Sequence, residues 1–134
     1  MYVKGGTATT QQTEKYWNKT VEFNGNKVYQ RDDIFDPNTI SSWKEKGKTV
    51  TGTNVERMES GRAPIGVDGK PINMHHVIQT QDGPIAEVTQ TFHQTNYNTI
   101  HINTGQLPSG INRAQFDLWK GDYWSNRALD FLNN

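Results

Sequence analysis

The sequence predicts an α+β fold in which short hairpins lead into a strand and a helix that both carry histidines. Two hairpin signals and one long helical pattern support this prediction, at residues 19–31, at Asp68-Gly69 and over residues 112–133. The chain has 134 residues, a common size for one domain with a single core. We therefore expect one domain over residues 15–134, preceded by a flexible N-terminus or linker at residues 1–14.

The first hairpin signal is KTVEFNGNKVYQR, residues 19–31. Val21 and Phe23 alternate with polar residues, Asn24-Gly25-Asn26 supplies a turn, and Val28 lies on the return strand. We expect an accessory N-terminal hairpin at this position.

Two helix signals follow this hairpin. Asp36-Pro37 places a favoured N-cap residue before a proline at the first helical position, so a helix is expected from there to Gly47. Thr53 or Asn54 is expected to cap a shorter helix that ends at Gly61.

The second hairpin signal lies in APIGVDGKPINMHHVIQ, residues 63–79. Asp68-Gly69 is a typical two-residue turn. The strand that follows it would carry Ile72, Met74 and then the pair His75-His76.

Two more helices are predicted in the second half of the chain. Asp82-Gly83-Pro84 would begin the first, in which Ile85, Val88 and Phe92 lie at i, i+3 and i+7 and form one apolar stripe, with His93 on its flank. The second covers residues 112–133, and its candidate packing residues are Phe116, Trp119, Tyr123, Leu129 and Phe131.

Composition restricts the chemistry that the chain can perform. It contains no cysteine, so disulfides and thiolate metal sites are excluded. Its net charge is zero, which is unusual for a dedicated nucleic-acid binder but allows a local basic patch. No apolar run approaches the roughly 20 residues that span a membrane, and the opening residues lack a signal-peptide core. We expect a soluble chain without its own secretion signal, which can still be one part of a longer exported protein.

The four histidines of the chain, His75, His76, His93 and His101, all fall within residues 75–101. Imidazole is the commonest metal-ligating side chain and titrates near neutral pH. Phosphodiester cleavage needs a divalent cation to neutralise charge on the phosphate and the leaving oxygen, and a general base to activate water. The cluster therefore favours metal-dependent phosphodiester hydrolysis over a purely structural role for the histidines.

Two other functions are compatible with the same histidines. One is a metal-dependent hydrolase that acts on another phosphoester or on an amide. The other is a non-enzymatic interaction module whose histidines hold a structural Zn²⁺, although closed structural zinc sites usually include cysteine. Incubation with plasmid and total RNA distinguishes these alternatives from a nuclease.

Several segments together resemble the LHH family of the HNH/endonuclease VII superfamily: NMHHVIQ, the DGP turn, AEVTQTFHQ and IHINTG. The upstream ERMESGRAPIGVDGKPIN and the downstream NRAQFDLWKGDYWSNRA are similar to the segments that flank this motif in the family, so the resemblance covers roughly residues 28–131. Met74 stands where the family has leucine, a change between apolar side chains of similar volume. All four family histidines are present.

The resemblance implies a ββα-metal core, treble-clef-like as in HNH nucleases, with the helices and the N-terminal hairpin as accessories. It implies a metal-dependent endonuclease that uses Mg²⁺, Mn²⁺ or Zn²⁺ on DNA or RNA. It also implies a C-terminal toxin module of a bacterial polymorphic toxin. Such a module is secreted on a larger carrier, acts in the target-cell cytoplasm and is neutralised in the producer by a cognate immunity protein.

The family pattern places all four histidines in the active site without dividing their roles. We assign the metal to His75, with His93 and His101 as further ligands, and the general base to His76, although His75 and His76 can be exchanged. An asparagine would orient the base, as in HNH sites, and the candidates are Asn98 and Asn103.

Substrate contacts are expected from Arg57, Arg62 and Lys70, because their cationic side chains suit phosphate. Gln79 follows the histidine pair and is expected to hold a ligand in place beside these contacts. Glu87 is expected to face solvent or to form a salt bridge rather than to act in catalysis.

Overall fold

A computed structural model of the chain describes residues 19–77, 83–95 and 112–132. The elements within these ranges are β1 (Lys19–Phe23), β2 (Asn26–Gln30), β3 (Ile40–Glu45), β4 (Lys48–Thr53), α2 (Asn54–Glu59), β5 (Asn73–His76), β6 (Ile85–Val88), α3 (Gln90–Thr95), α5 (Arg113–Arg127) and α6 (Leu129–Leu132). This mixture of strands and helices confirms the predicted α+β class. The expected N-terminal linker, residues 1–14, lies outside the described residues.

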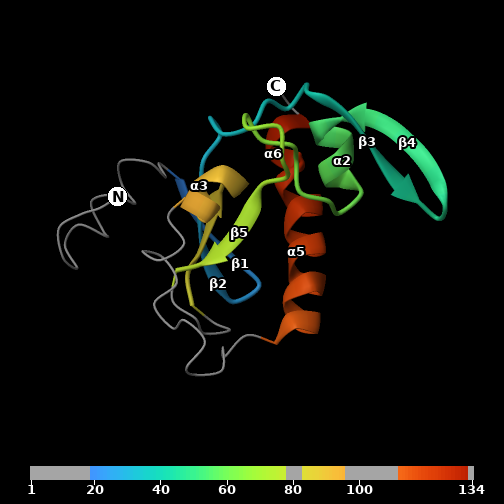
Figure 1. Cartoon of the computed structure of the whole chain (residues 1–134). Helices are drawn as coiled ribbons and strands as arrows, with labels where there is room; N and C mark the ends of the chain where they lie inside the picture. Colours follow the sequence, from blue (N-terminus) through green and yellow to red (C-terminus); the bar gives the residue numbers. More distant parts are fainter. Residues whose placement is uncertain (1–18, 78–82, 96–111, 133–134) are drawn as a thin grey trace.

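Four strands form one sheet in the order β1-β2-β6-β5, and β3 pairs with β4 in a separate two-stranded sheet. Strand β2 runs parallel to β6, whereas the β1–β2 and β5–β6 pairs are antiparallel. In Figure 1, α5 stands beside the four-stranded sheet, and β3 and β4 extend away on the other side of α5. No described helix has the length and apolar character needed to cross a membrane.

The N-terminal hairpin is confirmed as β1 and β2. Its turn residues Asn24 and Gly25 have φ angles of 44° and 89°, the left-handed pair that matches the twist of a two-residue hairpin. The return strand buries Val28, which joins the main core.

The expected helix from Asp36-Pro37 to Gly47 is wrong, because this segment forms a turn and then the hairpin β3–β4. The Asp36 carboxylate accepts a hydrogen bond from the Asn38 amide at 2.8 Å and closes a local turn instead of capping a helix. Lys46 and Gly47 have φ angles of 51° and 81°, so they form a two-residue hairpin turn that the sequence analysis missed.

The short helix expected after Thr53 is confirmed as α2. Thr53 is its N-cap and forms a reciprocal capping box with Glu56, with bonds of 3.2 Å and 2.8 Å. Gly61, two residues beyond the helix, has a φ of 86°, which only glycine adopts without strain.

The turn at Asp68-Gly69 is confirmed, but the strand that follows it has a different partner. Hydrogen bonds from Gly69 to Gly66 at 2.9 Å and from Gly66 to Lys70 at 2.7 Å close the turn. Beyond an isolated bridge between Ile65 and Pro71, the following strand β5 pairs with β6.

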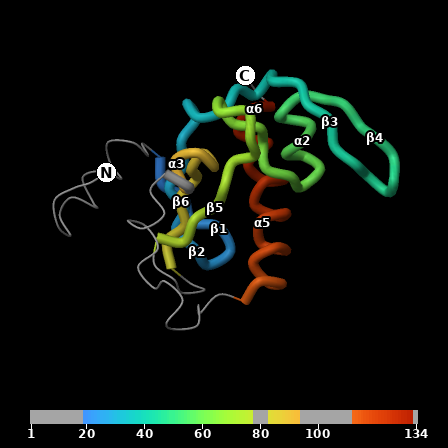
Figure 2. Tube along the Cα trace, viewed as in Figure 1, coloured from blue at the N-terminus to red at the C-terminus, as the bar shows by residue number. Residues whose placement is uncertain are grey.

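The helix expected to start at Asp82-Gly83-Pro84 is wrong, because Ile85–Val88 form strand β6 and helix α3 begins only at Gln90. All four β6 residues are buried. A strand covered on both faces lacks polar alternation, so its apolar residues also fit a helical stripe. Strand β6 lies between β2 and β5 in the sheet, and Figure 2 shows it leading into α3.

The last helical segment, predicted over 112–133, is confirmed with one break, since α5 ends at Arg127 and α6 begins at Leu129. Phe116, Trp119 and Tyr123 are buried as predicted and Phe131 is partly buried. Leu129 is 57% exposed, so its expected packing role is wrong. The main core comprises Val28, Ile34, Phe35, Met58, Ile72, Met74, Ile85, Phe116, Trp119, Tyr123, Trp124 and Ala128.

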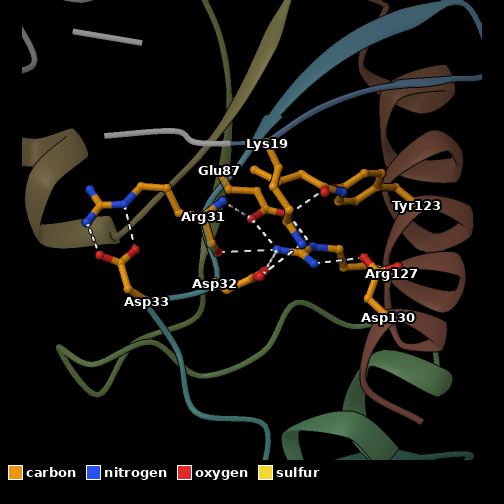
Figure 3. Close-up of polar contacts among 9 residues, drawn as sticks. Lys19, Arg31, Asp32, Asp33, Glu87, Tyr123, Arg127 and Asp130 are labelled. Carbon is orange, nitrogen blue, oxygen red and sulfur yellow. Dashed lines mark hydrogen bonds and ion pairs between the residues drawn. The ribbon is translucent and has the colours of Figure 1, made fainter. Parts of the chain in front are cut away.

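Glu87 forms the predicted salt bridge, but it is fully buried rather than solvent-facing. Its two carboxylate oxygens accept hydrogen bonds from Arg127, at 2.8 Å and 3.0 Å, and one of them also accepts from the Tyr123 hydroxyl at 2.5 Å. Arg127 further contacts Asp32 and Asp130 at 2.8 Å each, so the cluster joins the sheet to α5 (Figure 3).

Candidate functional site

A pocket of about 650 Å³ opens between β5, the end of α2, α3 and α5. Histidines and apolar side chains form part of its wall, and basic side chains form another part. Its lining residues are Arg57, Gly61, Arg62, Ala63, Ile72, Asn73, Met74, His75, His76, His93, Arg113, Phe116, Asp117, Lys120, Gly121 and Trp124.

His75 and His76 occupy the end of β5, where the ladder pairs them with Ala86 and Ile85 of β6. Consecutive strand residues point to opposite faces of a sheet. Both histidines nevertheless line one pocket, because β5 is the last strand in the described sheet and the pocket lies along it. Both side chains are largely buried, with residue exposures of 6% and 3%.

The two histidines contact different elements. The His75 ring lies with its centroid 5.1 Å from that of His93 on α3, at an interplanar angle of 67°. The His76 ring contacts Phe116 of α5, with centroids 4.5 Å apart at 61°. His75 therefore faces the helix that follows β6, and His76 faces the C-terminal helix.

The position of His93 depends on a tight connection between β6 and α3. Thr89 accepts hydrogen bonds from the Phe92 amide through its hydroxyl and from the His93 amide through its carbonyl, each at 3.0 Å. The Asp68 carboxylate accepts from the Thr91 amide at 3.0 Å and so ties α3 to the turn before β5. Burial would raise the pKa of Asp68, but hydrogen bonds from Thr91 and Lys70 outweigh it and lower the pKa.

The pair His75 and His93 fits a divalent cation by its donor chemistry, because imidazole nitrogens are common metal ligands. Their centroid distance of 5.1 Å is also usual for an edge-to-face ring pair. Within residues 19–77, 83–95 and 112–132, no group of three or more histidine or carboxylate side chains is placed to hold a metal. His101, the third predicted ligand, lies outside the described residues, as do Gln79, Asn98 and Asn103.

Two of the three predicted phosphate contacts line the pocket. Arg57 donates from Nε to the Ala63 carbonyl at 2.6 Å, and its guanidinium lies 5.7 Å from the centre of the Trp43 ring. Arg62 lies beside it, and burial together with the charge of Arg62 lowers the pKa of Arg57. Lys70, the third candidate, is exposed and is not among the lining residues.

Two basic residues of the pocket were missed by the sequence analysis, Arg113 and Lys120. The Lys120 ammonium lies 4.8 Å from the centre of the Phe116 ring and 3.4 Å from Asp117. Residues 113, 116 and 120 recur at helical spacing, so they share one face of α5. That periodicity is visible in the sequence, but it is equally typical of a solvent-exposed helix face beside an apolar stripe.

A pocket lined by imidazole, guanidinium and ammonium groups suits an anionic ligand such as a phosphoester. The family model described as a nuclease of the HNH/ENDO VII superfamily with conserved LHH matches residues 53–130. Because this match covers more than half of the chain, the protein belongs to that nuclease family, as its motifs predicted. No solved structure matches the chain.

Proposed function

We propose that this protein is a metal-dependent endonuclease that hydrolyses phosphodiester bonds of nucleic acid, with β5, β6 and α3 as its ββα-metal core. Membership of the nuclease family supports the activity. The order of two antiparallel strands and a helix, with histidines on β5 and α3, supports the core. The single observation that carries the proposal is the approach of His75 to His93 beside His76, in a pocket edged by four basic side chains.

The proposal assigns metal binding to His75 and His93, with His101 as a further ligand, and proton transfer to His76. A bound Mg²⁺, Mn²⁺ or Zn²⁺ would supply charge neutralisation at the phosphate and the leaving oxygen. The His76 imidazole accepts the proton of the attacking water. Its ring packs against Phe116, and this contact restricts the orientations that the imidazole can adopt.

The basic side chains have the complementary role of holding the substrate. Arg57, Arg62, Arg113 and Lys120 would contact phosphate oxygens on either side of the scissile bond. Arg57 is preorganised for this contact, because the Ala63 carbonyl and the Trp43 ring hold its guanidinium in place. An anion bound between Arg57 and Arg62 would also relieve the repulsion that contributes to the lowered pKa of Arg57.

The proposal extends to the biological setting that the family resemblance implies. We place the domain at the C-terminus of a bacterial secreted polymorphic toxin that acts in the target-cell cytoplasm and is neutralised by a cognate immunity protein. Expression of the chain inside a bacterial cell should stop growth, and His76→Ala should not. Equal growth with both proteins would contradict the toxin role.

The nuclease activity is tested by incubating supercoiled plasmid and total RNA, side by side, with EDTA, Mg²⁺, Mn²⁺ or Zn²⁺. We expect metal-dependent cutting of at least one polymer by the wild type and none by His76→Ala. Cutting by both proteins at one rate would remove His76 as the base. No cutting in any lane would contradict the nuclease and favour another phosphoester or a structural metal.

A further inference from the structure

No residue of the β3–β4 hairpin lines the pocket described above, and almost all of the hairpin precedes the residues that the family model matches. It extends past α2, away from the four-stranded sheet (Figure 1). Three lysines lie around its turn, Lys44, Lys46 and Lys48, and all three are exposed. Within the described part of the chain, none of the three forms an ion pair.

The hairpin has one inward and one outward face. The register pairs Trp43 with Val50 on the inward face, where Trp43 is buried. On the outward face Ser42 pairs with Thr51 and Lys44 with Thr49, and all four are exposed. The hydroxyls of Ser42 and Thr51 lie 2.8 Å apart. This face therefore presents hydroxyl groups and the Lys44 ammonium, both common donors to phosphate oxygens. Lys46 lies in the turn, and Lys48 is in register with Glu45.

The single acidic side chain of residues 40–53, Glu45, is engaged within the protein. It accepts a hydrogen bond from the Trp43 indole at 2.7 Å and pairs with Arg62 at 3.6 Å. Its negative charge is thus opposed by a guanidinium, and the three lysines dominate the outer part of the hairpin.

Arg62 joins this hairpin to the pocket. It lines the pocket, and its Nη2 donates to the Lys44 carbonyl at 2.7 Å. Thr53 ends β4 and caps α2, the helix that carries Arg57, whose guanidinium lies over Trp43. The hairpin is therefore fixed relative to the site by side-chain contacts as well as by the chain.

We propose that β3–β4 is a second nucleic-acid contact, which grips the phosphate backbone of the substrate outside the cleavage pocket through Lys44, Lys46 and Lys48. This inference rests on the proposed nuclease function and adds a second contact with the substrate. A substrate that continues beyond the pocket would reach the lysines.

The test measures binding rather than cleavage. A labelled DNA duplex of about 40 base pairs and an RNA of similar length are titrated with the protein in EDTA, and again with His76→Ala in the presence of metal. The variant replaces all three lysines by glutamine: Lys44→Gln, Lys46→Gln and Lys48→Gln. For duplex DNA, each phosphate contact contributes about 0.9 to the slope of log K against log salt. We expect the variant to lower that slope by roughly two to three and to weaken binding about tenfold at moderate salt.

Lys27→Gln is the matched control, because Lys27 is also exposed and lies on the N-terminal hairpin of the other sheet. It should leave both affinity and slope unchanged, and circular dichroism checks that every variant is folded. An unchanged slope in the triple variant overturns the proposal, even when the wild type cleaves nucleic acid and the nuclease function stands. Binding of polyglutamate that depends on the three lysines, with no such dependence for DNA or RNA, also overturns it and identifies an acidic protein as the partner.

Discussion

Two buried polar clusters lie on the neighbouring strands β5 and β6, and they differ in what their side chains face. Glu87 on β6 meets Arg127, Tyr123 and the Arg31 amide, and its carboxylate is enclosed by protein (Figure 3). His75 and His76 on β5 are almost as buried, but they border a pocket of about 650 Å³. A buried charge whose partners are all supplied by the fold acts on stability. Buried imidazoles that line a pocket with basic side chains can contact a ligand bound there.

The order of the strands produces this difference. β6 lies between β2 and β5, so any polar side chain on it must find its partners inside the protein. β5 lies beyond it with the pocket alongside. Position in the sheet, rather than the type of residue, therefore separates the structural cluster from the candidate active site.

The largest effect is expected in the histidine cluster. His76→Gln should lower the cleavage rate about 10²–10⁴-fold, the usual contribution of a general base, while the protein stays folded. Steady-state cleavage and thermal melting of the same preparation measure both quantities. If the variant unfolds instead, His76 contributes to stability as Glu87 does. The two clusters would then not differ in role.

Variants of the Glu87–Arg127 ion pair should lower the stability of the protein. Arg127→Met leaves Glu87 buried without its guanidinium, so the free energy of unfolding should drop by about 3–5 kcal/mol. The double variant Arg127→Met with Glu87→Leu should regain much of that loss, because apolar groups can replace a buried ion pair. Urea denaturation of the wild type, the two single variants and the double variant gives the coupling energy. Additive losses would show that the pair is not coupled.

Tyr123→Phe tests one hydroxyl of the same cluster. It removes a donor to Glu87 and an acceptor for the Gln30 amide, so we expect a loss of about 1–3 kcal/mol. Burial, and then the charge of Glu87, raise the pKa of Tyr123 far above its usual value. The folded state therefore favours the protonated phenol, and its contribution should be full below about pH 10 and fall as the pH rises further. A Tyr123→Phe protein whose stability falls equally in alkali would assign that loss to other groups.

The smallest effect on stability is expected from Asp32, at the exposed edge of the Glu87–Arg127 cluster. Burial would raise the pKa of Asp32, but bonds and charges from Lys19 and Arg127 outweigh it and lower the pKa. Its contribution to stability should hold above about pH 4 and disappear as the pH falls through the lowered value. Denaturation curves between neutral and acid pH should show a shallower acid loss for Asp32→Asn than for the wild type. Parallel curves would mean that Asp32 contributes nothing measurable.

Sequence patterns succeeded where structure is local. The hairpin turn at Asn24-Gly25 and the Thr53 capping box follow from the residues at a few adjacent positions. The long helix from residue 113 follows from apolar spacing, but that spacing did not predict its break at Ala128. The same method failed at Asp36-Pro37 and at Asp82-Gly83-Pro84, where a helix-start signal precedes a strand. Strand β6 pairs with β2, a distant segment that a local signal cannot report. Strand β3 pairs with the adjacent β4, so there the local signal of the Lys46-Gly47 turn was missed.

The residue types of the chain define its chemical groups: no thiolates, four clustered histidines and motifs that identify a nuclease family. Which of these groups lie in contact depends on how the strands and helices pack. That packing brings His93 against His75, places Arg113 and Lys120 in one pocket with Arg57, and buries Glu87 against Arg127. The physical reason is that residue type fixes what a side chain can bind or ionise. Its neighbours are set by strand order and helix packing, which depend on contacts between distant segments.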